Sequence, residues 1–212
     1  SDLSGKITRV NDLEYFEGNP DLNAYRKHIG KLMFNYRQHS LSLSWQYLSD
    51  VIDNTMTIKD GVVYVQPQNI GREHNVVLDY NYTGNICPWW QANSYVMGCY
   101  AYLPENLSYK HGWSGYFSLT NRFTTGSIGN FTLELVALTD NIALNQKVKG
   151  YCVINLSYSR DFFRKKLNIR IGANDPFHSY RSDNKSFYPD VFREQHGKFS
   201  TDKLSLTFTY II

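Results

Sequence analysis

Apolar and polar residues alternate with a period of two over most of this chain, in segments of roughly 8 to 12 residues. This period predicts β-strands with one apolar and one polar face, because successive side chains point to opposite sides of a strand. Helical periodicity is almost absent. The clearest alternating segments are 41–47, 76–82, 117–123, 131–135, 152–158, 167–173 and 204–210. The sequence therefore predicts an all-β, antiparallel up-and-down meander of about nine long strands.

The connections between these segments are short and long in turn. Short turns are predicted near residues 38–40, 84–88, 125–129 and 161–166, and longer polar loops over 53–72, 103–112, 139–150 and 175–201. Outer-membrane β-barrels have this organisation, with short periplasmic turns and long extracellular loops. About ten residues at roughly 3.3 Å each, tilted near 45°, rise about 23 Å, which matches the apolar band of such a barrel. The meander is thus predicted to be part of a transmembrane β-barrel.

Aromatic residues support a membrane location for the strands. They make up 16% of the chain, with 17 Tyr, whereas charged residues fall to 19%. Trp89, Trp90, Phe123, Phe162, Phe163 and Tyr210 lie beside the short turns, and Tyr102, Tyr109 and Trp113 beside the long loops. Two aromatic groups at fixed depths are typical of the interface girdles of a membrane barrel.

Several classes of function are not supported by the sequence. The net charge of +3 is mild and no basic run is longer than Arg164-Lys165-Lys166, so we expect no nucleic-acid partner. The three cysteines lack the spacing of a zinc site, and no segment of 18 apolar residues predicts a transmembrane helix. No nucleophile with its base, phosphate loop or metal cluster is apparent, so we expect no enzyme and no cofactor.

Four charged residues of the predicted strands lie on the polar face: Asp79, Arg122, Glu134 and Arg170. In a barrel this face lines the lumen, where such charges either pair with one another or border a substrate path. Four aromatic residues of the loop 175–201 are predicted to contact a ligand by stacking, although packing within the loop explains them equally well. They are Phe177, Tyr180, Phe187 and Tyr188.

Two other architectures remain open at this stage. Alternation with a period of two is also common in secreted β-sandwiches, and such a domain would bind carbohydrate through its aromatic loops. A smaller, complete porin-like barrel is the other alternative, and it requires an even number of strands.

Short segments in order along the chain resemble the motifs of one family. They are Glu17-Gly18-Asn19-Pro20-Asp21-Leu22, then 68–71, 112–116, 147–151, 174–177 and the final strand. Together they resemble the C-terminal β-barrel portion of TonB-dependent outer-membrane receptors, in a barrel family common in Bacteroidetes. Two positions depart from the pattern: Asn23-Ala24-Tyr25 stands where the family has Lys-Pro-Glu, and Ile211-Ile212 follows Tyr210 where the family ends on an aromatic residue.

The resemblance implies a 22-stranded barrel, filled by an N-terminal plug, that imports a nutrient ligand with energy passed on by TonB. Residues 1–27 are then an extracellular loop leading into the barrel, and residues 28–212 are the C-terminal part of the barrel, without the plug and the N-terminal strands. The implied partners are outer-membrane lipid, the plug and remaining strands of the same receptor, and TonB through the missing N-terminal part. The implied location is the outer membrane of a Gram-negative bacterium.

Overall fold

A computed structural model of the chain describes residues 4–104, 107–126, 128–188 and 190–210, which are organised almost entirely as β-strands. The strands are β1 (Ile7–Asn11), β2 (Glu14–Glu17), β3 (Arg26–Tyr36), β4 (His39–Lys59), β5 (Val62–Cys87), β6 (Trp90–Tyr102), β7 (His111–Thr124), β8 (Asn130–Leu138), β9 (Asn141–Ala143), β10 (Gln146–Val148), β11 (Tyr151–Phe162), β12 (Leu167–Asn174), β13 (Ser182–Phe187), β14 (Phe192–Gly197) and β15 (Lys203–Tyr210). Among these described residues, no helix is long and apolar enough to cross a membrane.

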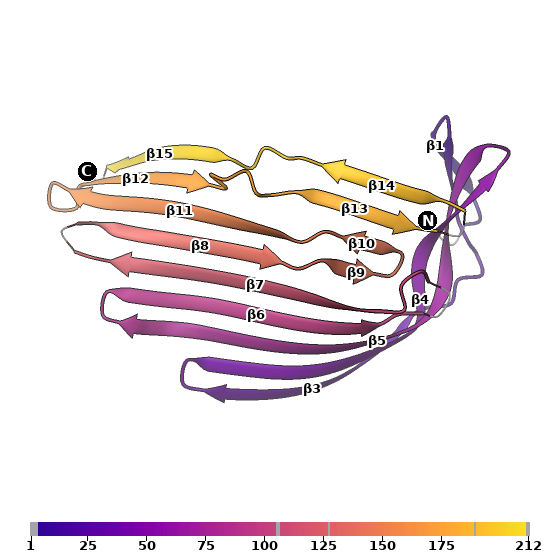
Figure 1. The fold of residues 1–212 in the computed structure, drawn as a ribbon, viewed down its shortest axis with the longest axis horizontal. Coiled ribbons are helices and arrows are strands. Elements are labelled where there is room, and N and C mark those ends of the chain that lie inside the picture. Colours follow the sequence, from indigo (N-terminus) through magenta and orange to yellow (C-terminus); the bar gives the residue numbers. More distant parts are fainter. Residues whose placement is uncertain (1–3, 105–106, 127, 189, 211–212) are drawn as a thin grey trace.

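One antiparallel meander forms the main body of the molecule. Its strands pair in the order β3-β4-β5-β6-β7-β8-β11-β12-β15, each with the next. Figure 1 shows the short turns at the left end of this sheet and the long loops at the right end. The predicted meander of about nine long strands is therefore confirmed. The predicted long loop 53–72 is wrong, because β4 and β5 stay paired through this segment and are joined by only two residues, Asp60 and Gly61.

The strand register gathers apolar side chains on one face of the main sheet. Trp45 pairs with Val76, Val76 with Tyr100, and Tyr100 with Trp113, so these four share a face. The same face carries Leu204, whose side chain is 82% exposed. Other exposed residues on it are Leu32, Phe34, Leu41, Leu43, Leu78, Val96, Phe131, Leu156, Ile171, Leu206 and Phe208. We call this surface the apolar face and the opposite surface the polar face.

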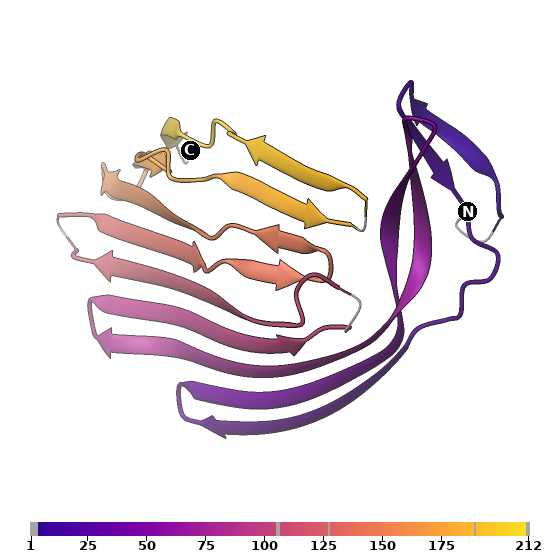
Figure 2. The same ribbon diagram turned by 45° about the vertical axis from the view of Figure 1, so that its right-hand side comes forward.

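The hairpin of β4 and β5 continues well beyond the main sheet. Figure 2 shows its outer half standing away from the sheet at the long-loop end. The hairpin bends at an irregularity around Asp50 and Gly71, which have φ angles of 55° and 126°. One extra residue on β4 is followed by one extra residue on β5, so the register after the bend is the same as before it. Asp60 and Gly61 close the tip, both with positive φ, as a two-residue hairpin turn requires.

The N-terminal segment lies against this outer half of the hairpin. β1 and β2 form a hairpin, and β2 pairs in parallel with Val63–Val65 of β5. Asn19 Nδ2 donates to the carbonyl oxygen of Pro67 over 3.1 Å, and the backbone N–H of Asn23 donates to Asn69 Oδ1 over 2.8 Å. The segments 19–23 and 67–69 are therefore in contact, and they overlap two motifs that lie far apart in the sequence.

A second, four-stranded sheet forms from two long connections, in the order β14-β13-β10-β9. Its hairpins β9–β10 and β13–β14 come from the loops 139–150 and 175–201, and β10 pairs with β13 to join them. Both segments were predicted to be loops, and this prediction is wrong for the residues that form β9, β10, β13 and β14. Their strands are short and rich in charged residues, as in Ser182–Phe187 with the sequence SDNKSF, so they carry no period-two signal.

Candidate functional site

The polar face of the main sheet carries all four charged residues that the sequence analysis singled out. Asp79 is the most firmly held: its carboxylate accepts hydrogen bonds from Ser42 Oγ over 2.9 Å and from the Tyr95 hydroxyl over 2.6 Å. Register places Arg122 beside Gln91 and Thr132 on the same face. The structure thus gathers the four residues on one surface, while their role in a lumen stays a prediction.

The other charges on the polar face have neutral neighbours. Asn155 Nδ2 lies 3.5 Å from Glu134 Oε2, and Arg170 Nη2 lies 3.4 Å from Ser157 Oγ. These contacts join neighbouring strands. Because the partners are neutral amide or hydroxyl groups, the contacts do not neutralise the charges of Glu134 and Arg170.

The long-loop end of the polar face is covered by packed loops. Val51, Ile70, Ala101, Leu103 and Leu107 form the buried core of the molecule, and Ile142 packs against them. Glycine at position 112 allows β9 to approach β7 here, because a Cβ on it would lie 2.9 Å from Ile142 Cδ1. Since Ala101 and Gly112 pair on the polar face, the second sheet lies over that side of the molecule.

A charged pocket of about 510 Å³ lies on the second sheet, on the side that faces this core. Lys147 pairs directly with Ile142 and with Lys185, which places all three side chains on that side. The residues that line the pocket are Tyr109, Asp140, Lys147, Lys149, Asp183, Asn184, Lys185, Phe187, Glu194 and His196. Its volume is in the range of pockets that hold small-molecule ligands.

Opposite charges inside the pocket are paired. Lys185 Nζ lies 2.8 Å from Glu194 Oε1, and Lys147 Nζ lies 3.3 Å from Asp140 Oδ2. Lys185 lowers the pKa of Glu194 chiefly by its hydrogen bond, and Glu194 raises the pKa of Lys185 in return. The pKa of Asp140 is lowered mainly by the backbone N–H of Gly150 and further by Lys147 and Lys149. The pocket therefore presents both signs of charge next to the rings of Tyr109 and Phe187.

A second, separate hollow lies on the polar face of the main sheet. It has a volume of about 580 Å³ and lies over β6, β7 and β8, lined by Tyr95, Met97, Ser114, Gly115, Tyr116, Ser118, Leu138, Thr139 and Asn141. Both hollows lie on the polar-face side of the molecule. The charged pocket combines charged and aromatic side chains, which suits a water-soluble solute, whereas the surface of the second hollow is mainly apolar.

The four predicted ligand-contact residues are placed differently from one another. Phe177 is 68% exposed just after β12. Tyr180 packs edge-on against Tyr151, with ring centroids 4.8 Å apart, and Phe187 packs against Tyr109 at 5.3 Å. Tyr188 donates its backbone N–H to the carbonyl oxygen of Val191. The rings of Tyr180 and Phe187 thus hold loops together, and Phe187 also borders the charged pocket; ligand contact by the four remains a prediction.

Tyr109 and Asp175 have roles that the sequence did not indicate. Tyr109 was expected in an aromatic girdle, but it turns towards the second sheet to contact Phe187. Asp175 is almost fully buried, with 1% of its surface exposed, although its sequence context is that of a turn. A girdle is nevertheless present at this end of the apolar face, where the ring of Tyr100 contacts Tyr102 and Trp113.

The Asp175 carboxylate holds the beginning and the end of the last long loop together. Its Oδ1 accepts from the backbone N–H and the hydroxyl of Ser179, and its Oδ2 accepts from the backbone N–H of Tyr180 and from Thr201 Oγ1. The Ser179 and Thr201 hydroxyls lower the pKa of Asp175 well below its usual value. A second acid, Asp53, accepts a hydrogen bond of 3.0 Å from Asn145 Nδ2 in the turn between β9 and β10, and burial raises the pKa of Asp53.

Comparison with known proteins gives one result. A protein-family model described as the outer membrane protein beta-barrel family matches residues 1–210. Comparison with curated proteins and with solved structures found no match. Within the described residues, no group of His, Cys, Asp and Glu side chains is arranged to hold a metal ion.

Proposed function

We propose a function from one premise: this chain belongs to the outer membrane protein β-barrel family. The proposal is that its main sheet is part of a wide barrel that imports a polar solute as a TonB-dependent receptor. Membership places the protein in the outer membrane of a Gram-negative bacterium, so a secreted β-sandwich no longer applies. The apolar face then meets lipid and the polar face lines the lumen, because lipid-facing and lumen-facing residues alternate along barrel strands.

The observation that carries the proposal is the open shape of the main sheet. Among the described residues, β3 pairs only with β4 and β15 only with β12, so the sheet has two free edges (Figure 2). Every residue of both edge strands is exposed. In a bilayer, each unpaired backbone N–H or C=O group costs several kcal/mol, so both edges require partner strands. Since barrel diameter grows with strand number, the proposal adds many more strands between the two free edges to close a wide barrel.

The proposal assigns a role to each surface of the chain. The free edges pair with the remaining strands of the receptor, and the lumen side contacts the plug domain, through which TonB acts. The charged pocket and the hollow over β6, β7 and β8 lie on the proposed entry path of the solute, with Tyr109 and Phe187 beside the charged groups. We propose transport, and no enzymatic reaction, for this path.

A porin-like barrel fits the family equally well, and conductance separates the two functions. The full-length protein, purified from outer membranes, is inserted into a planar lipid bilayer. We expect no steady conductance, because a plug fills the lumen, whereas a porin-like barrel holds a water-filled channel.

Uptake in whole cells gives the second measurement for the same proposal. Uptake of the solute that supports growth through this protein is expected to fall to background when a protonophore removes the energy of the inner membrane. Steady conductance together with uptake that is insensitive to the protonophore would assign the protein to the porin-like class.

A further inference from the structure

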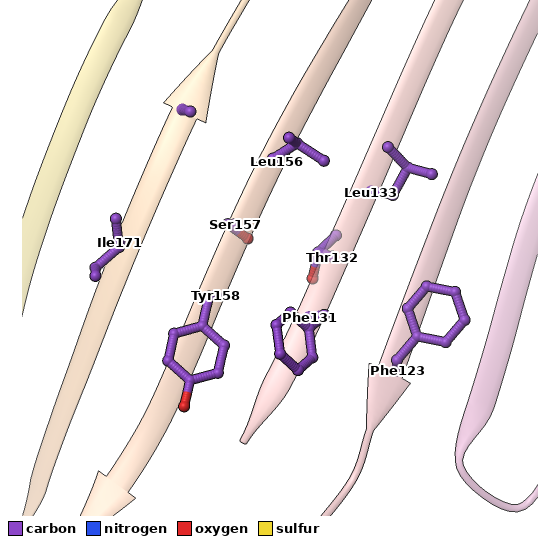
Figure 3. A pocket seen from close by; sticks show the side chains of 9 residues that line it. Phe123, Phe131, Thr132, Leu133, Leu156, Ser157, Tyr158 and Ile171 are labelled. Carbon is purple, nitrogen blue, oxygen red and sulfur yellow. The ribbon is translucent and has the colours of Figure 1, made fainter. Parts of the chain in front are cut away.

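A hollow of about 490 Å³ interrupts the apolar face near the short-turn end. Figure 3 shows it from close by, with the rings of Phe123, Phe131 and Tyr158 at one end and Leu133 and Leu156 at the other. It is lined by Phe123, Phe131, Thr132, Leu133, Leu156, Ser157, Tyr158, Ile171 and Ala173, on β7, β8, β11 and β12. Its surface is almost wholly apolar, so a hydrocarbon chain suits it better than a polar solute.

Local backbone and side-chain geometry fixes the shape of this hollow. The Tyr158 hydroxyl donates to the carbonyl oxygen of Ile128 over 2.6 Å, which ties the ring to the β7–β8 turn. Glycine at position 129 permits this, because a Cβ on it would lie 2.7 Å from Tyr158 Cε2. At the other end, the small side chain of Ala173 lies beside Leu156 and leaves space between the strands.

Cationic side chains lie directly beyond the ring end of the hollow. Arg160 is the next residue after Tyr158 on the same face of β11, about 7 Å further along the strand. Its guanidinium lies over the ring of Phe162, 5.3 Å from the centroid. The turn that follows adds the exposed side chains of Arg164, Lys165 and Lys166. The nearest acid along the strand, Asp161, points to the opposite face and accepts a hydrogen bond from Asn168.

The depth of these groups determines what they meet. Short turns mark the periplasmic end of an outer-membrane barrel, and the leaflet on that side consists of phospholipid. Arginine side chains at such a boundary lay their apolar stems along the surface and keep their charge at the level of the headgroups. Clustered basic residues at a membrane surface attract anionic lipids. The apolar hollow thus suits the acyl chain of a lipid, and the cationic side chains suit its anionic headgroup.

We infer that this surface binds one anionic phospholipid of the periplasmic leaflet. One acyl chain occupies the hollow, and the phosphate lies against Arg160 and the turn 164–166. The inference rests on the family and on the geometry of the apolar face, so it is independent of what the barrel transports.

Native mass spectrometry tests this inference. The full-length protein is released from nanodiscs that hold equal amounts of phosphatidylglycerol and phosphatidylethanolamine, and the lipid retained by each protein is counted. Wild type is expected to retain one phosphatidylglycerol in preference to phosphatidylethanolamine. Arg160→Gln should lower the affinity for phosphatidylglycerol about tenfold, the expected loss for one charge-assisted contact. Ala173→Phe should lower it as well, because the new ring fills the hollow while keeping the surface apolar.

Arg170→Gln is the matched control, because Arg170 pairs with Ser159 at nearly the same depth but on the polar face. It should retain phosphatidylglycerol like wild type. All variants are compared only after folding is confirmed by their heat-modifiable mobility in gels. Equal retention of the two lipids by wild type, or unchanged retention in both Arg160→Gln and Ala173→Phe, would overturn the inference. Displacement of the lipid by inorganic phosphate would also overturn it, because the hollow would then contribute nothing.

Discussion

At the scale of single residues, neighbours on one strand meet different surroundings because their side chains point to opposite faces. Ile154 and Val153 on β11 illustrate this: Ile154 pairs with Leu135 on the apolar face, and Val153 pairs with Val136 on the polar face. Both are β-branched, apolar and partly buried, and Ile154 lies level with Leu119 near the middle of β7. The same substitution at the two positions therefore reports the medium that each face meets.

Ile154→Arg is expected to lower the free energy of unfolding of the full-length protein in lipid vesicles by about 2 to 4 kcal/mol, because it places a charge in hydrocarbon. Val153→Arg should cost much less, because a lumen admits water. Urea titration in vesicles measures both values. Equal costs for the two variants would mean that the apolar face does not meet lipid.

Asp175 gives a residue-scale prediction about pH. Its folded pKa is lowered, so its contribution to stability is fully present above the ordinary value of 3.8 and is lost as the pH falls below it. Asp175→Asn replaces one acceptor by a donor facing the backbone N–H of Tyr180. We expect amide exchange across residues 176–201 to become severalfold faster at pH 7 in the variant.

The same measurement in acid provides the check. Below about pH 4 the carboxylate takes up a proton whenever the loop opens, so the advantage of wild type over the variant should shrink progressively as the pH falls towards the lowered folded pKa. A difference between them that is as large at pH 3 as at pH 7 would show that Asp175 acts by something other than its charge.

At the scale of elements, the two glycines of the β7–β8 turn meet different surroundings, which the sequence of the turn does not show. In the β7–β8 turn, Gly126 and Gly129 have φ angles of 61° and 120°. A Cβ on Gly126 would meet nothing within 4 Å, whereas one on Gly129 would lie 2.7 Å from the carbonyl oxygen of Ser159. The two glycines therefore differ in packing as well as in backbone conformation.

Gly126→Ala is expected to cost about 1 to 2 kcal/mol, as a left-handed conformation usually does for alanine. Gly129→Ala should cost at least about 1 kcal/mol more, because β11 has to move away as well. Denaturant unfolding of both variants in vesicles gives the comparison. The packing explanation fails if the two costs are the same.

The long strands were predictable from sequence because each has one apolar and one polar face. Successive residues therefore alternate between apolar and polar along the strand. Leu41–Tyr47 and Leu204–Tyr210 follow that period and lie in β4 and β15 as expected. The second sheet was not predictable, since its short strands are held by pairing between distant loops, as between Val148 and Asn184. The charged pocket was not predictable either, because Lys147 and Lys185 become neighbours only through the pairing of β10 with β13.

At the scale of the whole molecule, the free edges of the main sheet make a prediction about hydrogen exchange. If the chain is part of a larger closed barrel, β3 and β15 gain partners on their open sides. Their backbone amides should then exchange as slowly as those of β6 and β7 when the full-length protein is measured in lipid. Exchange that is much faster in β3 and β15 than in the central strands would show that the sheet remains open.

The compensated bend in the hairpin of β4 and β5 has a consequence for engineering and for evolution. Because one extra residue on β4 is offset by one on β5, the strand register of the membrane part does not depend on the length of the hairpin beyond the bend. The outer half can therefore gain or lose residues in cross-strand pairs around Asp60 and Gly61 without turning any side chain of the membrane part to the wrong face. The tip is thus a permissive position, where an epitope or a new recognition loop can be displayed on the cell surface while the membrane-spanning sheet keeps its register.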